Sequence, residues 1–279
     1  MRLGGPVFVE TDDPKELAKA HTAEGYRAAY CPGVTLQQPE RIREIESAFA
    51  AEGVVIAEVG GAWGNMITPD LQKRNAQINT VCERLTVADE VGALGCVNFT
   101  GTYDPNSAYD PHPKNLTDEC FDLIVETVQH ILDTAKPKRS CFMLEMMPVV
   151  FPDSADSYVA LLKAVDRPSF RVHLDPVNII TSPWRFFNNG SVIKECFDKL
   201  GHAIVSCHGK DIVMPPTYMV EINECRPGTG TLDYRTFLTE LNRLPGDVPL
   251  MLEHLPNKEE YDLAKTYVMG VASELGLSF

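Results

Sequence analysis

The stretch FRVHLDPVNIITSPWRFFNNGSVIKECFDKLGHAIVSCH, residues 170–208, decides the fold. It begins with the apolar run FRVHLD (170–175), passes through a charged segment typical of a helix near residues 189–200, and returns to the apolar run AIVSCH (203–208). Short apolar runs between turn residues are typical of buried strands, whereas charges at three-to-four spacing indicate a helix. The stretch therefore predicts one strand–helix–strand unit of a parallel sheet.

The same alternation runs along the whole chain. Eight strand–helix pairs are predicted, with strands at residues 6–10, 26–31, 54–59, 96–100, 141–146, 170–175, 203–208 and 250–255. No Pro/Gly/Ser-rich linker divides them. Eight consecutive pairs in 279 residues favour an α/β fold, a single (β/α)8 TIM barrel domain spanning residues 1–279. A doubly wound open sheet is the alternative, because strand order cannot be read from one sequence.

Composition limits the classes of partner. A net charge of −14 opposes binding to phosphate backbones and to anionic membrane surfaces. The chain lacks both an apolar run long enough to span a bilayer and the apolar core of a signal peptide at its start. Its eight cysteines form no CxxC pair, which is typical of reduced, buried thiols. We therefore expect a cytoplasmic protein with neither a nucleic-acid nor a membrane partner.

Polar residues stand near the C-terminal ends of four predicted strands, at Glu145, Asp175, His208 and Glu253. The active site of a TIM barrel lies at these strand ends. Because strand side chains alternate between the two faces, all four can point into the barrel mouth together, while His254 is expected to point away from it. Three converging carboxylates repel one another unless a cation neutralises them. Carboxylates with one imidazole suit Mn²⁺, Mg²⁺ or Co²⁺, and Zn²⁺ less well.

With these residues in this order, the chain resembles the sugar phosphate isomerase/epimerase superfamily of xylose isomerase-like TIM barrels over essentially its whole length. The motifs that carry the resemblance are LEMMP (144–148), HLDPVN (173–178), CHGKD (207–211), PGTGTLDY (227–234) and LEHL (252–255). The resemblance implies one divalent ion, Mn²⁺ first with Mg²⁺, Co²⁺ or Zn²⁺ as alternatives, bound by Glu145, Asp175, His208 and Glu253. It also implies that Glu145 and Glu253 transfer the substrate's protons.

The substrate-binding positions are less uniform. Ketose 3-epimerases of the superfamily carry a histidine, a glutamate and an arginine where this chain has Asn178, Phe151 and Met214. A free ketose substrate is therefore in doubt. Each candidate substrate contact also has a structural alternative, such as an ion pair, a core hydrogen bond or loop packing; the candidates are Lys210, Arg226, His173, Asn178, Trp63 and Glu58.

The expected function is a divalent-metal-dependent sugar isomerase or epimerase. It would abstract a proton next to a carbonyl and pass through a metal-stabilised ene-diolate. One alternative is a metal-dependent lyase or dehydratase of the same superfamily, such as an enzyme that cleaves 3-oxo-glycosides. A second alternative is a non-catalytic barrel that binds a metabolite. The expected partner is a small-molecule carbohydrate, and the resemblance also raises a homo-oligomer.

Overall fold

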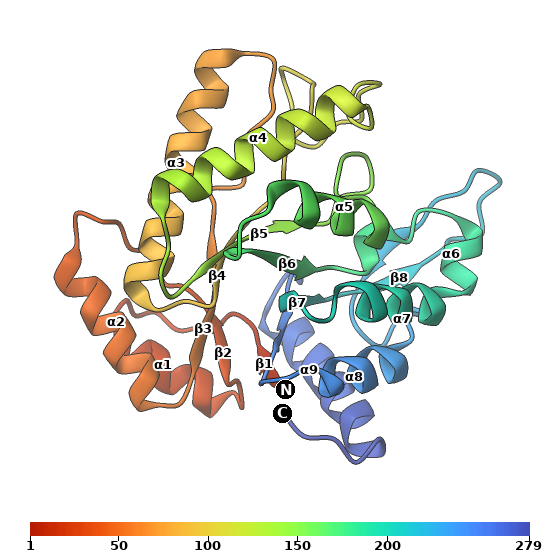
Figure 1. Ribbon diagram of the computed structural model, residues 1–279. Helices are drawn as coiled ribbons and strands as arrows, with labels where there is room; N and C mark the ends of the chain where they lie inside the picture. The colour runs from red at the N-terminus through yellow and green to blue at the C-terminus, as the bar shows by residue number, and fades with distance from the viewer.

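Eight parallel strands close into a barrel in the computed structural model, which describes residues 1–279 (Figure 1). Around the barrel the strands follow the order β1–β10–β7–β6–β5–β4–β3–β2, and β2 closes on β1. Their bounds are β1 (Arg2–Gly4), β2 (Ala28–Tyr30), β3 (Val55–Gly60), β4 (Gly95–Asn98), β5 (Cys141–Glu145), β6 (Phe170–Leu174), β7 (Ile204–Gly209) and β10 (Pro249–Leu252). The predicted (β/α)8 barrel is confirmed, and the open sheet is wrong.

Helices form the outer layer, one or two after each strand (Figure 1). They are α1 (Pro14–Ala23), α2 (Pro39–Ala51), α3 (Leu71–Val91), α4 (Asp118–Ala135), α5 (Ala155–Val165), α6 (Pro183–Phe187), α7 (Asn189–Leu200), α8 (Tyr234–Arg243) and α9 (Lys258–Glu274). Side chains of Asp70, Thr117 and Asn257 accept backbone N–H groups at the starts of α3, α4 and α9, which fixes where these helices begin. None of the helices combines the length and apolar character needed to span a bilayer.

The first strand lies earlier than its sequence pattern predicts. Residues 6–10 read as a strand, yet β1 is the three-residue segment Arg2–Gly4, and Phe8 and Val9 lie half-exposed in the loop that follows it. Phe8 packs on Tyr261 of α9 instead, with ring centroids 5.6 Å apart. The true strand escapes the pattern because it is short and ends in a glycine. That glycine is needed, since a side chain at Gly4 would clash with Met251 inside the barrel.

Methionines fill the barrel interior beneath its mouth. Met251 packs with Ala28 and Ala57, and Met143 packs with Val97 and Cys141. The larger apolar core lies between the sheet and the helices. Such a packed interior is typical of TIM barrels and leaves the mouth as the place where polar side chains gather.

A two-stranded hairpin interrupts the connection between β7 and α8. Its strands β8 (Asp211–Val213) and β9 (Asn223–Cys225) pair antiparallel outside the barrel, in a stretch that the sequence predicts as a long loop or pocket wall. The loop between them carries the exposed Tyr218 and Met219 and reaches out beside α6 (Figure 1). The hairpin therefore forms one wall above the strand ends.

Candidate metal centre

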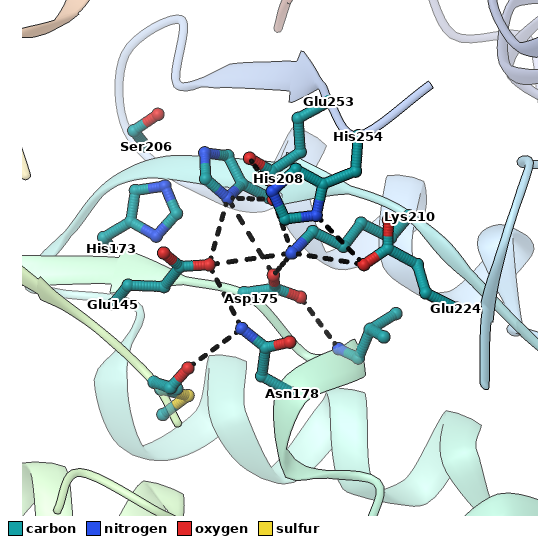
Figure 2. Close-up of polar contacts among 12 residues, drawn as sticks. Glu145, His173, Asp175, Asn178, Ser206, His208, Lys210, Glu224, Glu253 and His254 are labelled. Carbon is teal, nitrogen blue, oxygen red and sulfur yellow. Dashed lines mark hydrogen bonds and ion pairs between the residues drawn. The ribbon is translucent and has the colours of Figure 1, made fainter. Parts of the chain in front are cut away.

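Glu145, Asp175, His208 and Glu253 converge at the barrel mouth (Figure 2). Glu145 ends β5, Asp175 and Glu253 directly follow β6 and β10, and His208 lies near the end of β7; these four strands are neighbours in the barrel. One ligand atom from each residue lies within 4.8 Å of the others. The mouth thus contains a buried group of three carboxylates and one imidazole that is able to bind a metal ion.

His208 has its two ring nitrogens in different surroundings. Its Nε2 lies 3.3 Å from the Glu58 carboxylate, while its Nδ1 lies 2.7 Å from Glu253 and 3.4 Å from Glu145. Burial by itself lowers the pKa of His208, but the charges of Glu253 and Glu58 outweigh it and raise the pKa well above its ordinary value. A carboxylate that accepts one N–H of an imidazole directs the other nitrogen toward a metal ion. Glu58 gives His208 this orientation.

Glu58, His173 and Ser206 form a hydrogen-bonded layer beneath the four converging residues. One carboxylate oxygen of Glu58 accepts from His173 Nε2 at 3.1 Å and from the Ser206 hydroxyl. Burial alone would raise the pKa of Glu58, but His173 and His208 hold it well below its usual range. Glu58, His173 and His208 are also close enough to hold an ion. Glu58 already makes direct hydrogen bonds to both imidazoles and to Ser206, so we interpret this layer as support for His208.

Lys210 supplies positive charge to the acidic cluster. Its ammonium lies 2.8 Å from Asp175, 2.5 Å from Glu253 and 3.7 Å from Glu145 (Figure 2). Burial lowers the pKa of Lys210, but these carboxylates outweigh it and raise the pKa far above its ordinary value. Burial likewise raises the pKa of Asp175, but Lys210 and His208 reverse this effect and hold it low. Lys210 therefore neutralises part of the negative charge of the three carboxylates.

The donor atoms fit a metal ion. Asp175 Oδ2, Glu253 Oε1 and His208 Nδ1 are buried without a well-oriented hydrogen bond, although the two oxygens contact the Lys210 ammonium. Buried polar atoms without hydrogen bonds are uncommon and call for a partner of another kind. Three such atoms in one cluster, all electron-pair donors, fit a divalent ion bound by oxygen and imidazole ligands. Such an ion and Lys210 would offer positive charge to the same two oxygens.

Asn178, Glu224 and His254 complete the mouth. Asn178 donates to Glu145 Oε1 at 3.1 Å and to the Met146 carbonyl at 3.0 Å, which fixes the position of the Glu145 carboxylate. Glu224 on β9 lies 3.7 Å from the Lys210 ammonium and accepts from His254 at 3.1 Å. This hydrogen bond raises the pKa of His254.

Sequence reasoning missed Glu224 and gave His254 the wrong direction. Strand alternation predicts that His254 points away from the mouth, but a backbone φ of 58° places its ring 3.6 Å from the Glu253 carboxylate. Glu224 belongs to a hairpin within a stretch that the sequence predicts as loop. The only sequence signal for Glu224 is that it is a carboxylate in a long connection beside the mouth.

Arg226 and Trp63 lie apart from the cluster. Arg226 Nε is 2.8 Å from the carboxylate of Glu260, in the first turn of α9, and Nη1 donates to the Pro227 carbonyl. Trp63 stacks on Phe99 with ring centroids 6.0 Å apart and is partly exposed. Neither side chain makes a polar contact with the four converging residues. The structure thus brings together Lys210, Asn178, His173 and Glu58 among the predicted contacts, but leaves Arg226 and Trp63 outside.

The fold and this site define a (β/α)8 barrel with a carboxylate–histidine cluster at its C-terminal mouth. A family model described as xylose isomerase-like TIM barrel matches residues 17–267, so the chain belongs to that family. No curated protein sequence matches the chain.

Solved structures show the same fold at low sequence identity. A xylose isomerase-like TIM barrel protein from Mycobacterium smegmatis in complex with magnesium has 17% identity and a TM-score of 0.67, over 93% of this chain and 88% of that one. D-psicose 3-epimerase from Clostridium cellulolyticum H10, solved with D-tagatose, has 14% identity and a TM-score of 0.69, over 100% of both chains. A probable 3-DHS dehydratase, AsbF from Bacillus anthracis, has 15% identity and a TM-score of 0.67, over 95% and 96%.

Proposed function

We propose that the protein is a divalent-metal-dependent isomerase or epimerase that acts on a small-molecule carbohydrate. The observation that carries the proposal is the pair Glu145 and Glu253 within the buried cluster. Their side chains keep 9% and 13% exposure, whereas Asp175 and His208 are closed off at 0% and 1%. A substrate in the mouth would therefore reach these two carboxylates and no other ligand of the four.

The roles of the residues follow from this arrangement. A divalent ion bound by Glu145, Asp175, His208 and Glu253, with Mn²⁺ as our first choice, would supply Lewis-acid polarisation of a carbonyl oxygen. Glu145 would take the proton from the carbon next to that carbonyl, and Glu253 would return one from its own side. Asn178 holds Glu145 in place by donating a hydrogen bond to the Oε1 atom of Glu145. Lys210 would stabilise negative charge that develops on the substrate oxygens, because its ammonium already lies among the carboxylates.

The comparisons give the family and the fold of the chain without deciding the reaction. One neighbour is a sugar 3-epimerase and another is in complex with magnesium, but both are less than 20% identical to this chain. At that distance a structural likeness carries the fold alone. A homo-oligomer and a cytoplasmic location stay predictions.

A lyase or dehydratase is the second candidate function. The residues at three expected substrate-binding positions are the reason to retain it. Asn178, Phe151 and Met214 stand where the ketose 3-epimerases carry charged or imidazole side chains. Another neighbour in the comparisons is a probable dehydratase. The first step would be the same proton removal by Glu145. The reaction would then end in loss of the substituent on the neighbouring carbon, as in the cleavage of a 3-oxo-glycoside.

Solvent-deuterium exchange tests the proposal. The protein, stripped of metal and then given Mn²⁺, is incubated in D₂O with aldoses, ketoses and 3-oxo-glycosides, and isotope incorporation is measured by mass spectrometry. We expect metal-dependent exchange into at least one substrate. Glu145→Gln should lower its rate about 10²–10⁴-fold, since the base is lost. Glu46→Gln, which changes an exposed glutamate paired with Arg139, is the matched control.

The products separate the candidates. An epimer or isomer that differs in mass from the substrate only by incorporated deuterium supports the leading proposal, whereas a released substituent supports the lyase. Exchange that is unchanged in Glu145→Gln would remove this residue from the mechanism. If a sugar binds but no substrate of the panel exchanges, the result favours the non-catalytic barrel.

A further inference from the structure

Trp63 stands at the inner side of the barrel mouth. It follows β3, the strand that lies across the barrel from β7 and its His208. Glu58 of β3 contacts His208, so it faces the barrel interior, and Gly60, two residues further on, faces the same way. A side chain at Gly60 would collide with the indole of Trp63, whose Nε1 lies 2.9 Å from the position of that Cβ. The indole therefore occupies the interior above Glu58, facing the metal centre across the mouth.

Phe99 continues this aromatic side of the mouth toward Glu145. β4 and β5 pair in register at Asn98 and Leu144, so the next residues, Phe99 and Glu145, leave the two strands at the same level. Neighbouring strands lie about 4.8 Å apart. Trp63 stacks on Phe99 with ring centroids 6.0 Å apart and 22° between the ring planes. The stacked rings thus lie beside one of the two carboxylates that we propose as proton-transfer groups.

The aromatic wall, which consists of Trp63, Phe99 and Tyr109, leaves one ring free at the mouth. Phe99 contacts Tyr109 on its other side, with ring centroids 4.7 Å apart, and is only 2% exposed. Trp63 is covered by Phe99 on one side yet stays 40% exposed. Phe99 therefore supports the wall, and Trp63 is the ring that a ligand in the mouth can contact.

The backbone that carries Trp63 is strained. Ala62 and Trp63 have φ angles of 71° and 50°, in the left-handed region that residues other than glycine rarely adopt. Asn65 holds the loop by accepting the Thr102 N–H at 3.2 Å and donating to the Ser107 carbonyl at 3.1 Å. Strained residues of this kind persist where the surroundings impose them, and they cluster at ligand-binding sites. Two in succession at the mouth indicate that the position of the indole matters for function.

The mouth thus has a polar side and an aromatic side. Carboxylates and the Lys210 ammonium lie on one side, and the Trp63 indole lies on the other. A sugar ring matches both sides, because its oxygens lie around its edge while its faces carry C–H groups that can pack on an aromatic ring. An open-chain sugar has no flat face to offer. An apolar ring without oxygens would match the indole and leave the polar side without a partner.

We propose that Trp63 is a specificity-determining residue that stacks on one face of the substrate's ring. The substrate is then a sugar bound in cyclic form, and not an open-chain sugar. This inference rests on the proposed function, because it takes a carbohydrate at the metal centre as given, and it narrows the class of that carbohydrate.

Tryptophan fluorescence tests the contact directly, because the chain has only two tryptophans. The other, Trp184, lies on α6 and is 66% exposed. Trp184→Phe leaves Trp63 as the only emitting tryptophan, and Trp63→Phe leaves Trp184. Each Mg²⁺-loaded variant is titrated with methyl 3-oxo-β-D-glucopyranoside, a ring, and with D-erythrulose, a hydroxy-ketone too short to close a stable ring. We expect the ring probe to change the emission of Trp63 with saturation and to leave that of Trp184 unchanged, while erythrulose changes neither.

Calorimetry measures how much the indole contributes to binding of the ring probe. We expect Trp63→Ala to bind it about tenfold more weakly, since the stacked area is lost, and Trp63→Phe to stay within about threefold because an aromatic face remains. Trp184→Ala is the matched control and should stay within roughly twofold. A thermal melt confirms that each variant is folded. Equal weakening in the two alanine variants, equal affinity for both probes, or no saturable binding of the ring probe to the wild type would overturn the proposal.

A second arm separates this inference from the proposed function. Solvent-deuterium exchange into the ring probe is measured for the wild type and Trp63→Ala. We expect KM to rise about tenfold in the variant, with a smaller change in kcat. Exchange with the same KM in both proteins overturns the inference and leaves the proposed function standing. Saturable binding that changes the emission of Trp63 without any exchange fails the proposed function for this sugar and leaves the stacking contact standing.

Discussion

At the scale of single residues, the surroundings of His208 fix the orientation of its imidazole ring, as a proposed metal ligand requires. Its Nε2 faces Glu58, which is itself held by His173 and Ser206, so the ring cannot turn without breaking hydrogen bonds. Its Nδ1 is left facing carboxylates without a well-oriented hydrogen bond. Glu58, His173 and Ser206 thus orient the imidazole ring of His208, and its Nδ1 faces the carboxylates at the mouth.

This arrangement predicts that metal affinity rises with pH. An imidazole must be neutral to bind a metal ion, while the surrounding carboxylates raise the pKa of His208 and favour its protonated form in the metal-free protein. A metal ion therefore displaces a proton, and affinity should fall as pH falls below the raised pKa, by up to about tenfold per pH unit. Calorimetry with Mn²⁺ in two buffers of different ionisation enthalpy would measure the proton released.

The same pKa shift makes the stability of the metal-free protein fall with rising pH, which is opposite to its effect on metal affinity. Because the folded-state pKa is raised, protonated His208 stabilises the metal-free fold at pH values below its unfolded pKa of about 6.5, and this contribution is lost as pH rises through the folded pKa. Metal affinity that does not change with pH, together with no proton release, would contradict the assignment of His208 as a ligand.

At the scale of elements, the hairpin β8–β9 depends on one buried carboxylate. Asp211 accepts backbone N–H groups from Gly228 at 2.9 Å, Gly230 at 3.1 Å and Leu232 at 2.8 Å. These hydrogen bonds hold the segment after β9 against the start of β8. No side chain fits at Gly230, because it would clash with the Ile212 carbonyl. The hairpin in turn holds Glu224 beside Lys210.

Asp211→Asn should loosen the hairpin and leave the barrel intact. The amide replaces one acceptor oxygen with a donor that faces backbone N–H groups, at a cost of about 1–3 kcal/mol. Hydrogen exchange followed by mass spectrometry should show faster exchange in peptides from residues 211–232 and unchanged exchange in β5 and β6. Asp247→Asn, at an exposed aspartate next to the N-terminus, is the control. Faster exchange throughout the barrel would show that Asp211 supports the whole fold.

The elements also show what a sequence can and cannot predict. The alternation of apolar runs and helices gave the barrel, and strand parity placed Glu145 and His208 in one mouth, because both patterns are local and periodic. β1 was misplaced, since three residues are too few for a period to show. A left-handed backbone conformation directs the His254 side chain toward the barrel mouth, and the hairpin places Glu224 beside it. Both depend on contacts between distant segments, which no local pattern encodes.

At the scale of the whole molecule, the candidate metal centre joins half of the barrel. Its four proposed ligands lie at the ends of the neighbouring strands β5, β6, β7 and β10, which are spread over more than a hundred residues of sequence. A metal ion bound there would stabilise the closed barrel, because an unfolded chain does not hold the four ligands together. Without the ion, the same carboxylates are neutralised in part by Lys210 and by protonated His208.

Lys210→Met should therefore make the stability of the barrel depend on metal. Removing one partner from a buried group of charges costs about 3–5 kcal/mol, since the carboxylates of Asp175 and Glu253 lose the Lys210 ammonium and keep only protonated His208 as a nearby cation. We expect a loss of this size in urea unfolding with a chelator present, and recovery of much of it when Mn²⁺ is added. Lys265→Met is the matched control, because Lys265 pairs with Glu24 and Asp262 far from the mouth. Its smaller loss should not respond to Mn²⁺. If Lys210→Met were equally unstable with and without Mn²⁺, the ion and the ammonium would not serve the same carboxylates, and the metal centre would have to be placed elsewhere.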